Sequence, residues 1–231
     1  RTGNWQNSKT KETERGIIIA AVSAHSSVKA MAKVIDADVV LVQTEERFTA
    51  EQLAEKLAEL TAEDRQRVFA VIATGGTTNA GIIDDLVGIA EICEKENLWF
   101  HVDAAYGGGA LAAKSVRHLF NGIERANSVT IDPHKWLFSP YDCGAVIYKN
   151  LELAKSAHSQ EGSYLDIFSD EGGQGFNPSD YRIRLTRRVR GLPLWFSLAM
   201  HGTDRYEQAI ERGIELARIA GRMIKSSKHT L

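Results

Sequence analysis

Residues 98–106 read Leu-Trp-Phe-His-Val-Asp-Ala-Ala-Tyr, an apolar run followed by an acidic residue and then by small ones. The run at 98–102 predicts a buried β-strand, and Asp103 stands at its carboxyl end. Residues 132–136, Asp-Pro-His-Lys-Trp, repeat this arrangement with a lysine after the apolar run at 129–131. Two strands that each deliver a reactive side chain at the same end indicate a sheet whose edge carries a site.

Outward from these two strands, apolar runs alternate with amphipathic stretches. Strands are predicted over the apolar, often β-branched runs 17–22, 39–42, 68–73, 98–102, 129–131 and 145–148. Helices are predicted over about 23–35, 50–60 and 84–96, and from residue 193 onward. Such alternation favours an α/β fold with a mostly parallel sheet and helices on both faces. Ligands of such sheets bind beyond the carboxyl ends of the strands.

The composition is that of an ordinary globular protein, with 231 residues, 43% hydrophobic and 25% charged. A formal net charge of -2 implies no bulk attraction to nucleic acid or to an anionic membrane. Cys93 and Cys143 stand outside any metal-binding spacing, so neither a disulfide framework nor a metal site is expected. Because the apolar runs are short and residues 1–15 lack an apolar signal core, we expect a cytoplasmic protein.

The chemical interpretation depends on Lys135 and Asp103. Most lysines are solvated surface residues, but apolar residues at 136–138 follow Lys135, and apolar surroundings favour a neutral, nucleophilic amine. Such an amine forms an imine with the aldehyde of pyridoxal phosphate, and an acid beside the pyridine nitrogen makes the ring an electron sink. The alternative for Asp103 is a cap on a nearby backbone group. The small residues Ala104 and Ala105 would let a flat ring lie against the backbone.

His25, Thr78 and His134 follow strands at the same predicted edge and are weaker candidates. His25 is either a helix-start residue or an imidazole that stacks on the cofactor ring. The hydroxyl of Thr78 suits the phenolate oxygen of the cofactor, and the ring of His134 suits its phosphate. Tyr164 lies in the polar, glycine-containing stretch 158–180, which is typical of a long mobile loop. Its phenol is either an exposed anchor or part of a lid that closes over the cofactor.

At these residues the chain resembles the group II pyridoxal phosphate-dependent amino acid decarboxylases, the family of the aromatic L-amino acid, histidine and glutamate decarboxylases. The resembling segments are ordered along most of the chain, at 24–27, 73–78, 101–106, 132–136, 162–165 and 187–190. The resemblance implies a type I aminotransferase-like fold, pyridoxal 5'-phosphate as the cofactor and an amino acid as the substrate. It also implies a homodimer with shared active sites.

The resemblance assigns roles residue by residue. By motif match, Lys135 carries the imine link to the cofactor, Asp103 pairs with the pyridine nitrogen, and His25 stacks on the ring. Tyr164 matches the loop tyrosine that protonates the substrate carbon after carbon dioxide leaves. Further cofactor contacts are implied for Thr78 and His134. Ala105 is a candidate cofactor contact from its small size.

The chain departs from the family in two ways. Asp132 stands where the family often has asparagine, which puts the polar contact at that position in question. Family members are also considerably longer. Residues 1–200 are therefore expected to form the central part of the large cofactor-binding domain, without its N-terminal portion. Residues 201–231 are expected to lead, as a helix, into a C-terminal small domain that is absent, and the fragment alone is expected to lack a complete phosphate site.

The function predicted from these residues is α-decarboxylation of an L-amino acid to the corresponding amine and carbon dioxide. The nearest alternative couples decarboxylation to oxidative deamination and yields an aldehyde. In the family that switch accompanies loss of the loop tyrosine or of the stacking histidine, whereas Tyr164 and His25 are both present. An inactive fragment that serves as an assembly module is the alternative from another class. Neither nucleic acid nor membrane is an expected partner, and the sequence does not choose the amino acid.

Overall fold

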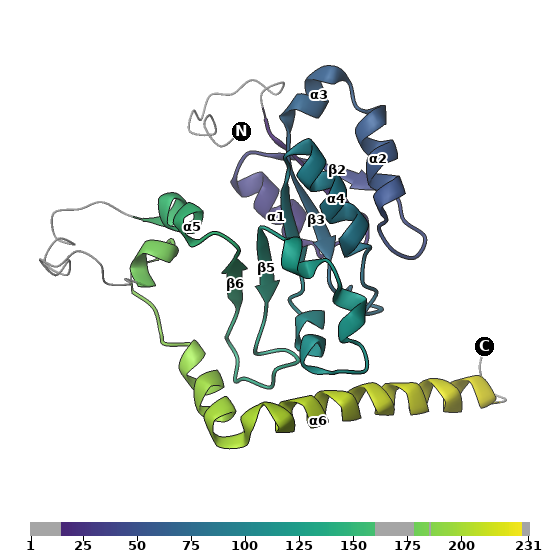
Figure 1. The fold of residues 1–231 in the computed structure, drawn as a ribbon, viewed down its shortest axis with the longest axis vertical. Helices are drawn as coiled ribbons and strands as arrows, with labels where there is room; N and C mark the ends of the chain where they lie inside the picture. The colour runs from purple at the N-terminus through teal and green to yellow at the C-terminus, as the bar shows by residue number, and fades with distance from the viewer. Residues whose placement is uncertain (1–14, 160–177, 185, 228–231) are drawn as a thin grey trace, which may run out of the picture.

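The computed structural model describes residues 15–159, 178–184 and 186–227, and its centre is a six-stranded sheet of order β2-β1-β3-β4-β5-β6 (Figure 1). The first five strands in the chain pair in parallel, and β6 returns antiparallel to β5. The predicted strands are confirmed at β1 (Ile17–Ala21), β2 (Asp38–Val42), β3 (Val68–Thr74), β4 (Trp99–Asp103), β5 (Ser128–Ile131) and β6 (Ala145–Tyr148).

Helices cover both faces of the sheet, as predicted. α1 (Ser27–Val34) packs on one face, and α2 (Ala50–Glu59) and α4 (Leu86–Glu96) pack on the other. Successive residues of a strand point to opposite faces, so β1 serves both layers. The side chain of Ile19 is fully buried against α2 and α4, and the side chain of Ile18 packs against α1. Complete burial of such a side chain stabilises the fold by about 1.5–3 kcal/mol.

Local sequence signals set the ends of α2 and α4, which cover the face of the sheet opposite α1. Thr49 and Gln52 form a reciprocal capping box at the start of α2, with the Gln52 Oε1 accepting from the Thr49 N–H at 3.0 Å. Asp85 caps α4 by accepting from the N–H of Gly88 at 3.2 Å. Asn97 ends α4 in the left-handed region, at φ 54°. The left-handed residue Asn97 ends α4 two residues before β4 begins.

Two helices were not predicted, because neither carries a broad apolar stripe. α3 (Ala62–Arg67) has no buried residue and is held by the Thr61 side chain, which accepts from the Asp64 N–H at 3.1 Å. α5 (Leu151–His158) buries only Ala154. Short 3₁₀ turns at 107–112, 117–120, 123–125 and 178–181 likewise show no periodic signal in the sequence.

The C-terminal helix α6 (Gly191–Ser226) confirms the helical pattern predicted from Pro193 onward. Gly202 interrupts it with φ 72°, and Figure 1 shows the resulting bend between a short arm and a long one. Tyr206 and Ile210 are the buried residues of α6. The division of the chain at residues 200 and 201 stays a prediction.

Asp84 fastens the turn after β3, and its replacement is expected to destabilise the fold. The carboxylate is 2% exposed and accepts from the backbone N–H of Phe48 at 2.9 Å and of Thr74 at 2.6 Å. Burial raises the pKa of Asp84, and the two backbone hydrogen bonds oppose that rise. Asp84→Ala leaves two buried N–H groups without an acceptor, so we expect a loss of about 3 kcal/mol in the free energy of unfolding.

Urea denaturation of Asp84→Ala beside Asp85→Ala measures that loss against a matched neighbour. Asp85 is half-buried and supplies only the cap of α4, so its loss should cost about 1 kcal/mol. Equal unfolding midpoints for the two variants would contradict the role given to Asp84.

Candidate active site

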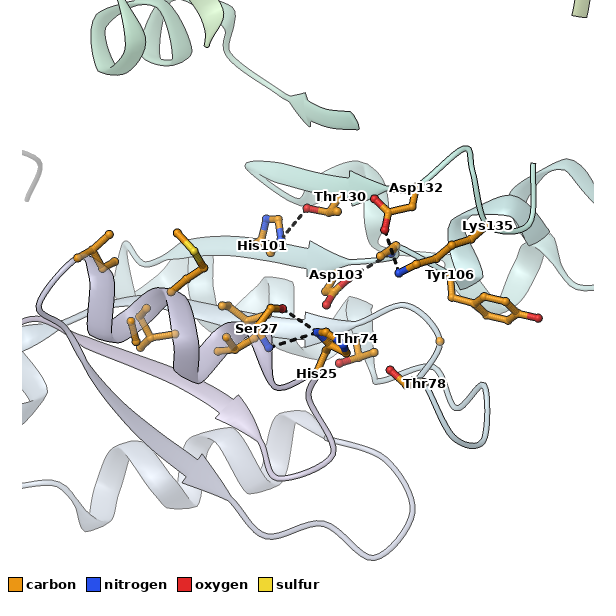
Figure 2. A pocket seen from close by; sticks show the side chains of 18 residues that line it. His25, Ser27, Thr74, Thr78, His101, Asp103, Tyr106, Thr130, Asp132 and Lys135 are labelled. Carbon is orange, nitrogen blue, oxygen red and sulfur yellow. Dashed lines mark hydrogen bonds and ion pairs between the residues drawn. The ribbon is translucent and has the colours of Figure 1, made fainter. Parts of the chain in front are cut away.

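A cavity of about 460 Å³ lies between α1 and the sheet, at the carboxyl ends of the parallel strands. Its walls come from β1, α1, β3, β4, β5 and the segments that follow β1, β3, β4 and β5. In Figure 2, residues of β4 and of the segment after β5 face His25 and Ser27 across the cavity. The titratable side chains in its lining are His25, His101, Asp103, Tyr106, Asp132 and Lys135. The predicted edge of the sheet is therefore where the polar side chains meet.

Asp103 is the last residue of β4, and its half-buried carboxylate lines the cavity. The neighbouring strands place Thr74 and Thr130 directly beside it in the sheet register. Its Oδ1 accepts from the N–H of Ala105 at 3.1 Å, so the backbone cap considered from the sequence is present. Within the described residues Oδ2 makes no hydrogen bond, which leaves one carboxylate oxygen for a ligand.

Lys135 reaches the same cavity from the turn after β5. Its Nζ lies 2.8 Å from Oδ2 of Asp132, and 37% of its side chain is exposed. The expectation of apolar surroundings for the amine is therefore wrong, because the turn between Asp132 and Lys135 folds the carboxylate back onto the amine. Apolar packing occurs one residue later, where the Trp136 ring stacks on Tyr106 with centroids 5.2 Å apart.

The weaker candidates divide between the cavity and its surroundings. His25, Thr78 and Ala105 line the cavity, and His25 Nδ1 lies 2.8 Å from the Ser27 hydroxyl. His134 is outside the lining, and its Nδ1 lies 2.6 Å from the carbonyl oxygen of Cys143. Its contact with a phosphate stays a prediction. Tyr164 lies outside the described residues, so its placement stays a prediction as well.

His101 is a lining residue that the sequence reasoning did not select. Its Nδ1 lies 2.7 Å from the Ser128 hydroxyl and its Nε2 lies 3.3 Å from the Thr130 hydroxyl. Burial lowers the pKa of His101, while the charge of Asp103 and a hydrogen bond to the backbone of Ser128 act in the opposite direction. The sequence could have identified His101 as a lining residue. Residues two apart in a strand share a face, and His101 stands two residues before Asp103.

Close backbone approach shapes the end of the cavity beside Thr78. Gly76 has φ 115°, which L side chains rarely adopt, and a Cβ there would lie 3.0 Å from Gly107 Cα. A Cβ on Gly107 would lie 2.0 Å from the carbonyl oxygen of Gly75. The turn after β3 and the segment after β4 can therefore approach this closely only because positions 76 and 107 are glycine.

The side chains in the cavity fit the ring of pyridoxal phosphate. The lining offers an amine for an aldehyde, a carboxylate oxygen for a protonated ring nitrogen, and the small residue Ala105 where a flat ring can approach the backbone. His25 adds an aromatic face, and Thr78 adds a hydroxyl. Among the described lining residues Lys135 is the one lysine or arginine, so the ring subsite is better supplied than a phosphate subsite.

The chain matches proteins of one family over nearly its whole length. The family described as the pyridoxal-dependent decarboxylase conserved domain matches residues 3–230. The aromatic-L-amino-acid decarboxylase of Bacillus atrophaeus is 33% identical over 212 residues, which are 89% of this chain and 44% of that protein. The protein of the same name from Cavia porcellus is 32% identical over 207 residues, with 88% and 43% covered.

Solved structures share the fold. Mouse CSAD matches with a TM-score of 0.85 at 31% identity, over 96% of this chain and 47% of that one. Oryza sativa TDC, solved with PLP and tryptamine, matches with a TM-score of 0.86 at 25% identity, over 93% of this chain and 45% of that one.

The fold and the cavity thus define a pyridoxal phosphate-type site on a type I α/β fold. The chain belongs to the pyridoxal-dependent decarboxylase family. The predictions of that family, of the fold and of the cofactor are confirmed. The chain spans less than half the length of the curated relatives it matches. In the part of the chain that the structure describes, no helix has the length and apolar character needed to cross a membrane.

Proposed function

We propose that this chain forms the cofactor-binding core of an enzyme that removes the α-carboxyl group of an L-amino acid as carbon dioxide and releases the amine. One observation carries the proposal: Lys135, Asp103 and His25 line a single cavity at the carboxyl edge of the sheet. When bound, pyridoxal phosphate supplies an aldehyde for amines and a ring that accepts the electron pair left on the α-carbon.

Each residue of the cavity has a defined task in this proposal. The Lys135 amine holds the cofactor covalently, and the free Oδ2 of Asp103 keeps the ring nitrogen protonated by its charge. His25 covers one face of the ring, and Ala105 leaves room on the other. Thr78 donates to the ring oxygen, and His134 contacts the phosphate from outside the described cavity lining.

Tyr164 distinguishes the two decarboxylating reactions. We propose that its phenol gives a proton to the substrate α-carbon after carbon dioxide has left, which a phenylalanine cannot do. Tyr164→Phe in the full-length protein should therefore lower the yield of amine while carbon dioxide release continues, and aldehyde and ammonia should appear when oxygen is present. Product analysis by chromatography, with Tyr148→Phe as the matched control, measures the change. Unchanged amine output would remove Tyr164 from the mechanism and make His25 the leading proton donor.

The names of the relatives suggest which class of amino acid to assay first. Two relatives carry the name aromatic-L-amino-acid decarboxylase, which favours aromatic amino acids as the first to be assayed. Amine release by the full-length protein from aromatic, acidic and basic L-amino acids tests the choice. Preferred turnover of an aromatic substrate supports it, and preferred turnover of an acidic one replaces it.

We propose that the enzyme is a cytoplasmic homodimer with shared active sites. Exposed aromatic and apolar side chains support an interface with a second copy of the chain. Tyr141 is 87% exposed, Met200 78% and Trp195 60%. Residues 1–200 belong to the large domain in this proposal, and 201–231 lead toward a small one. Sedimentation of the full-length protein tests the dimer, and a monomer that retains activity would contradict shared sites.

An inactive assembly module is the remaining alternative. A protein of that kind would neither bind the cofactor covalently nor release amine. Visible absorbance of bound cofactor before and after borohydride reduction separates it from an enzyme.

A further inference from the structure

A chain of hydrogen bonds lies under the ring subsite, on the floor of the cavity. His101 points into the cavity from β4, and its ring lies between two hydroxyl groups of β5, Ser128 at Nδ1 and Thr130 at Nε2. Figure 2 shows His101 on the same side of the cavity as Asp103, with Thr130 in contact. Ser128 is 5% exposed and also contacts Trp99, whose Nε1 lies 2.9 Å from the Ser128 Oγ.

These contacts fix the direction of each hydrogen bond. An indole N–H can only donate, so Trp99 donates to the Ser128 oxygen. Within the described residues the Ser128 hydroxyl then has one acceptor in reach, Nδ1 of His101 at 2.7 Å. The neutral ring therefore carries its proton on Nε2, directed at the Thr130 hydroxyl. A proton on Nδ1 would leave the buried Ser128 hydroxyl without an acceptor, which is unfavourable.

Asp103 is the charged group that most affects the imidazole of His101. Burial lowers the pKa of the imidazole, and two groups oppose that effect: the charge of Asp103 on the same strand and a hydrogen bond to the backbone of Ser128. Asp132 and Lys135, from the segment after β5, are paired with each other at 2.8 Å. His25 follows β1 and bonds to its own helix start. The lining residues from α1 and β3 are not titratable.

We propose that His101 is a positioning residue, held neutral by burial and by the hydroxyl group of Ser128, and that its neutrality reserves the negative charge of Asp103 for the ring nitrogen of the cofactor. An imidazolium two residues before Asp103 on the same face would compete for that carboxylate. The inference rests on the proposed function, because it assumes that Asp103 pairs with the pyridine ring. Ser128 acts through His101 and Trp99 and touches neither cofactor nor substrate.

The first test is the protonation of His101 in the cofactor-free full-length protein. Carbon-13 NMR of labelled histidine rings, with His101 assigned from a His101→Asn variant, gives its titration curve directly. Ser128→Ala removes the donor to Nδ1, so the midpoint should move up by about one pH unit. Thr130→Val removes the other hydroxyl and should give no upward shift, since it leaves the Ser128 contact in place. Ser128→Thr restores a hydroxyl and should behave as the parent.

The second test is binding of deoxypyridoxine phosphate, a cofactor analogue with a methyl group in place of the aldehyde. It cannot bond to Lys135, so its affinity reports the ring subsite alone. Between about pH 8 and about pH 5.5, Ser128→Ala should lose roughly tenfold more affinity than the parent protein. The double variant His101→Asn with Ser128→Ala should lose that extra dependence.

The outcomes separate this inference from the proposed function. Equal titration midpoints and equal pH profiles for the parent and Ser128→Ala would overturn the role of His101, as would a cationic His101 in the parent at neutral pH. An analogue that binds the parent and Asp103→Asn equally would instead overturn the pairing of Asp103 with the ring. Should Ser128→Ala fail to fold, Ser128→Cys takes its place, because a thiol is a weaker donor than a hydroxyl and should also raise the titration midpoint of His101. An unchanged midpoint in Ser128→Cys would overturn the role of the Ser128 hydroxyl.

Discussion

Lys135→Ala is expected to abolish covalent attachment of pyridoxal phosphate and to lower turnover by more than about a thousandfold, because no other amine lines the described cavity. The fold should survive, since the pair that Lys135 makes with Asp132 is partly exposed and such pairs are worth at most about 1 kcal/mol. The visible absorbance of the bound cofactor in the purified full-length protein measures the effect.

Lys114 serves as the control for the loss of a lysine outside the cavity. Lys114 also forms one ion pair, with Glu207 at 3.2 Å, but its side chain is 76% exposed and lies away from the cavity. Lys114→Ala should keep the absorbance and the turnover of the parent. Retained absorbance in Lys135→Ala would show that another lysine holds the cofactor.

Asp103→Asn is expected to lower turnover by several orders of magnitude, which corresponds to about 4 kcal/mol or more for a charge partner lost in a desolvated site. The substitution separates two tasks of Asp103. Asparagine keeps an oxygen that can accept from the Ala105 N–H, so the backbone cap survives, while the charge beside the ring nitrogen is lost. Steady-state kinetics of the full-length protein, with circular dichroism as a check on the fold, measures the effect.

Asp36→Asn is the control for a lost carboxylate elsewhere. Asp36 has φ 53°, a conformation that asparagine also tolerates, and it pairs with Arg15 outside the cavity. Its replacement should leave turnover unchanged. If the turnover of Asp103→Asn fell by less than tenfold, the carboxylate would serve only to cap the Ala105 N–H.

The sheet could be predicted because its strands are uniformly apolar and its helices carry apolar stripes. The run at 17–21 is buried along its whole length, which is the pattern of a strand covered on both faces. α3 escaped prediction because none of its residues is fully buried, so its six residues carry no periodic apolar signal beside the Thr61 cap. The antiparallel direction of β6 could not be predicted from its apolar residues either. A parallel and an antiparallel strand of four residues have the same apolar pattern.

The candidate site could be predicted where it depends on strand ends. Asp103 ends a parallel strand, and His25, Thr78 and Lys135 follow parallel strands. The carboxyl edge of the sheet therefore brings the four together. The Asp132 contact to Lys135 could not be predicted, because it depends on how tightly the turn after β5 folds. The orientation of His134 toward Cys143 likewise depends on tertiary packing between residues nine apart.

The central claim is that this cavity holds pyridoxal phosphate on Lys135. Borohydride reduction of the full-length protein with bound cofactor, followed by proteolysis and mass spectrometry, fixes the cofactor to the amine that carries it. We predict a stoichiometric pyridoxyl adduct on the peptide that contains Lys135 and on no other lysine. An adduct confined to another lysine, or no adduct at a cofactor concentration that saturates the protein, would contradict the claim.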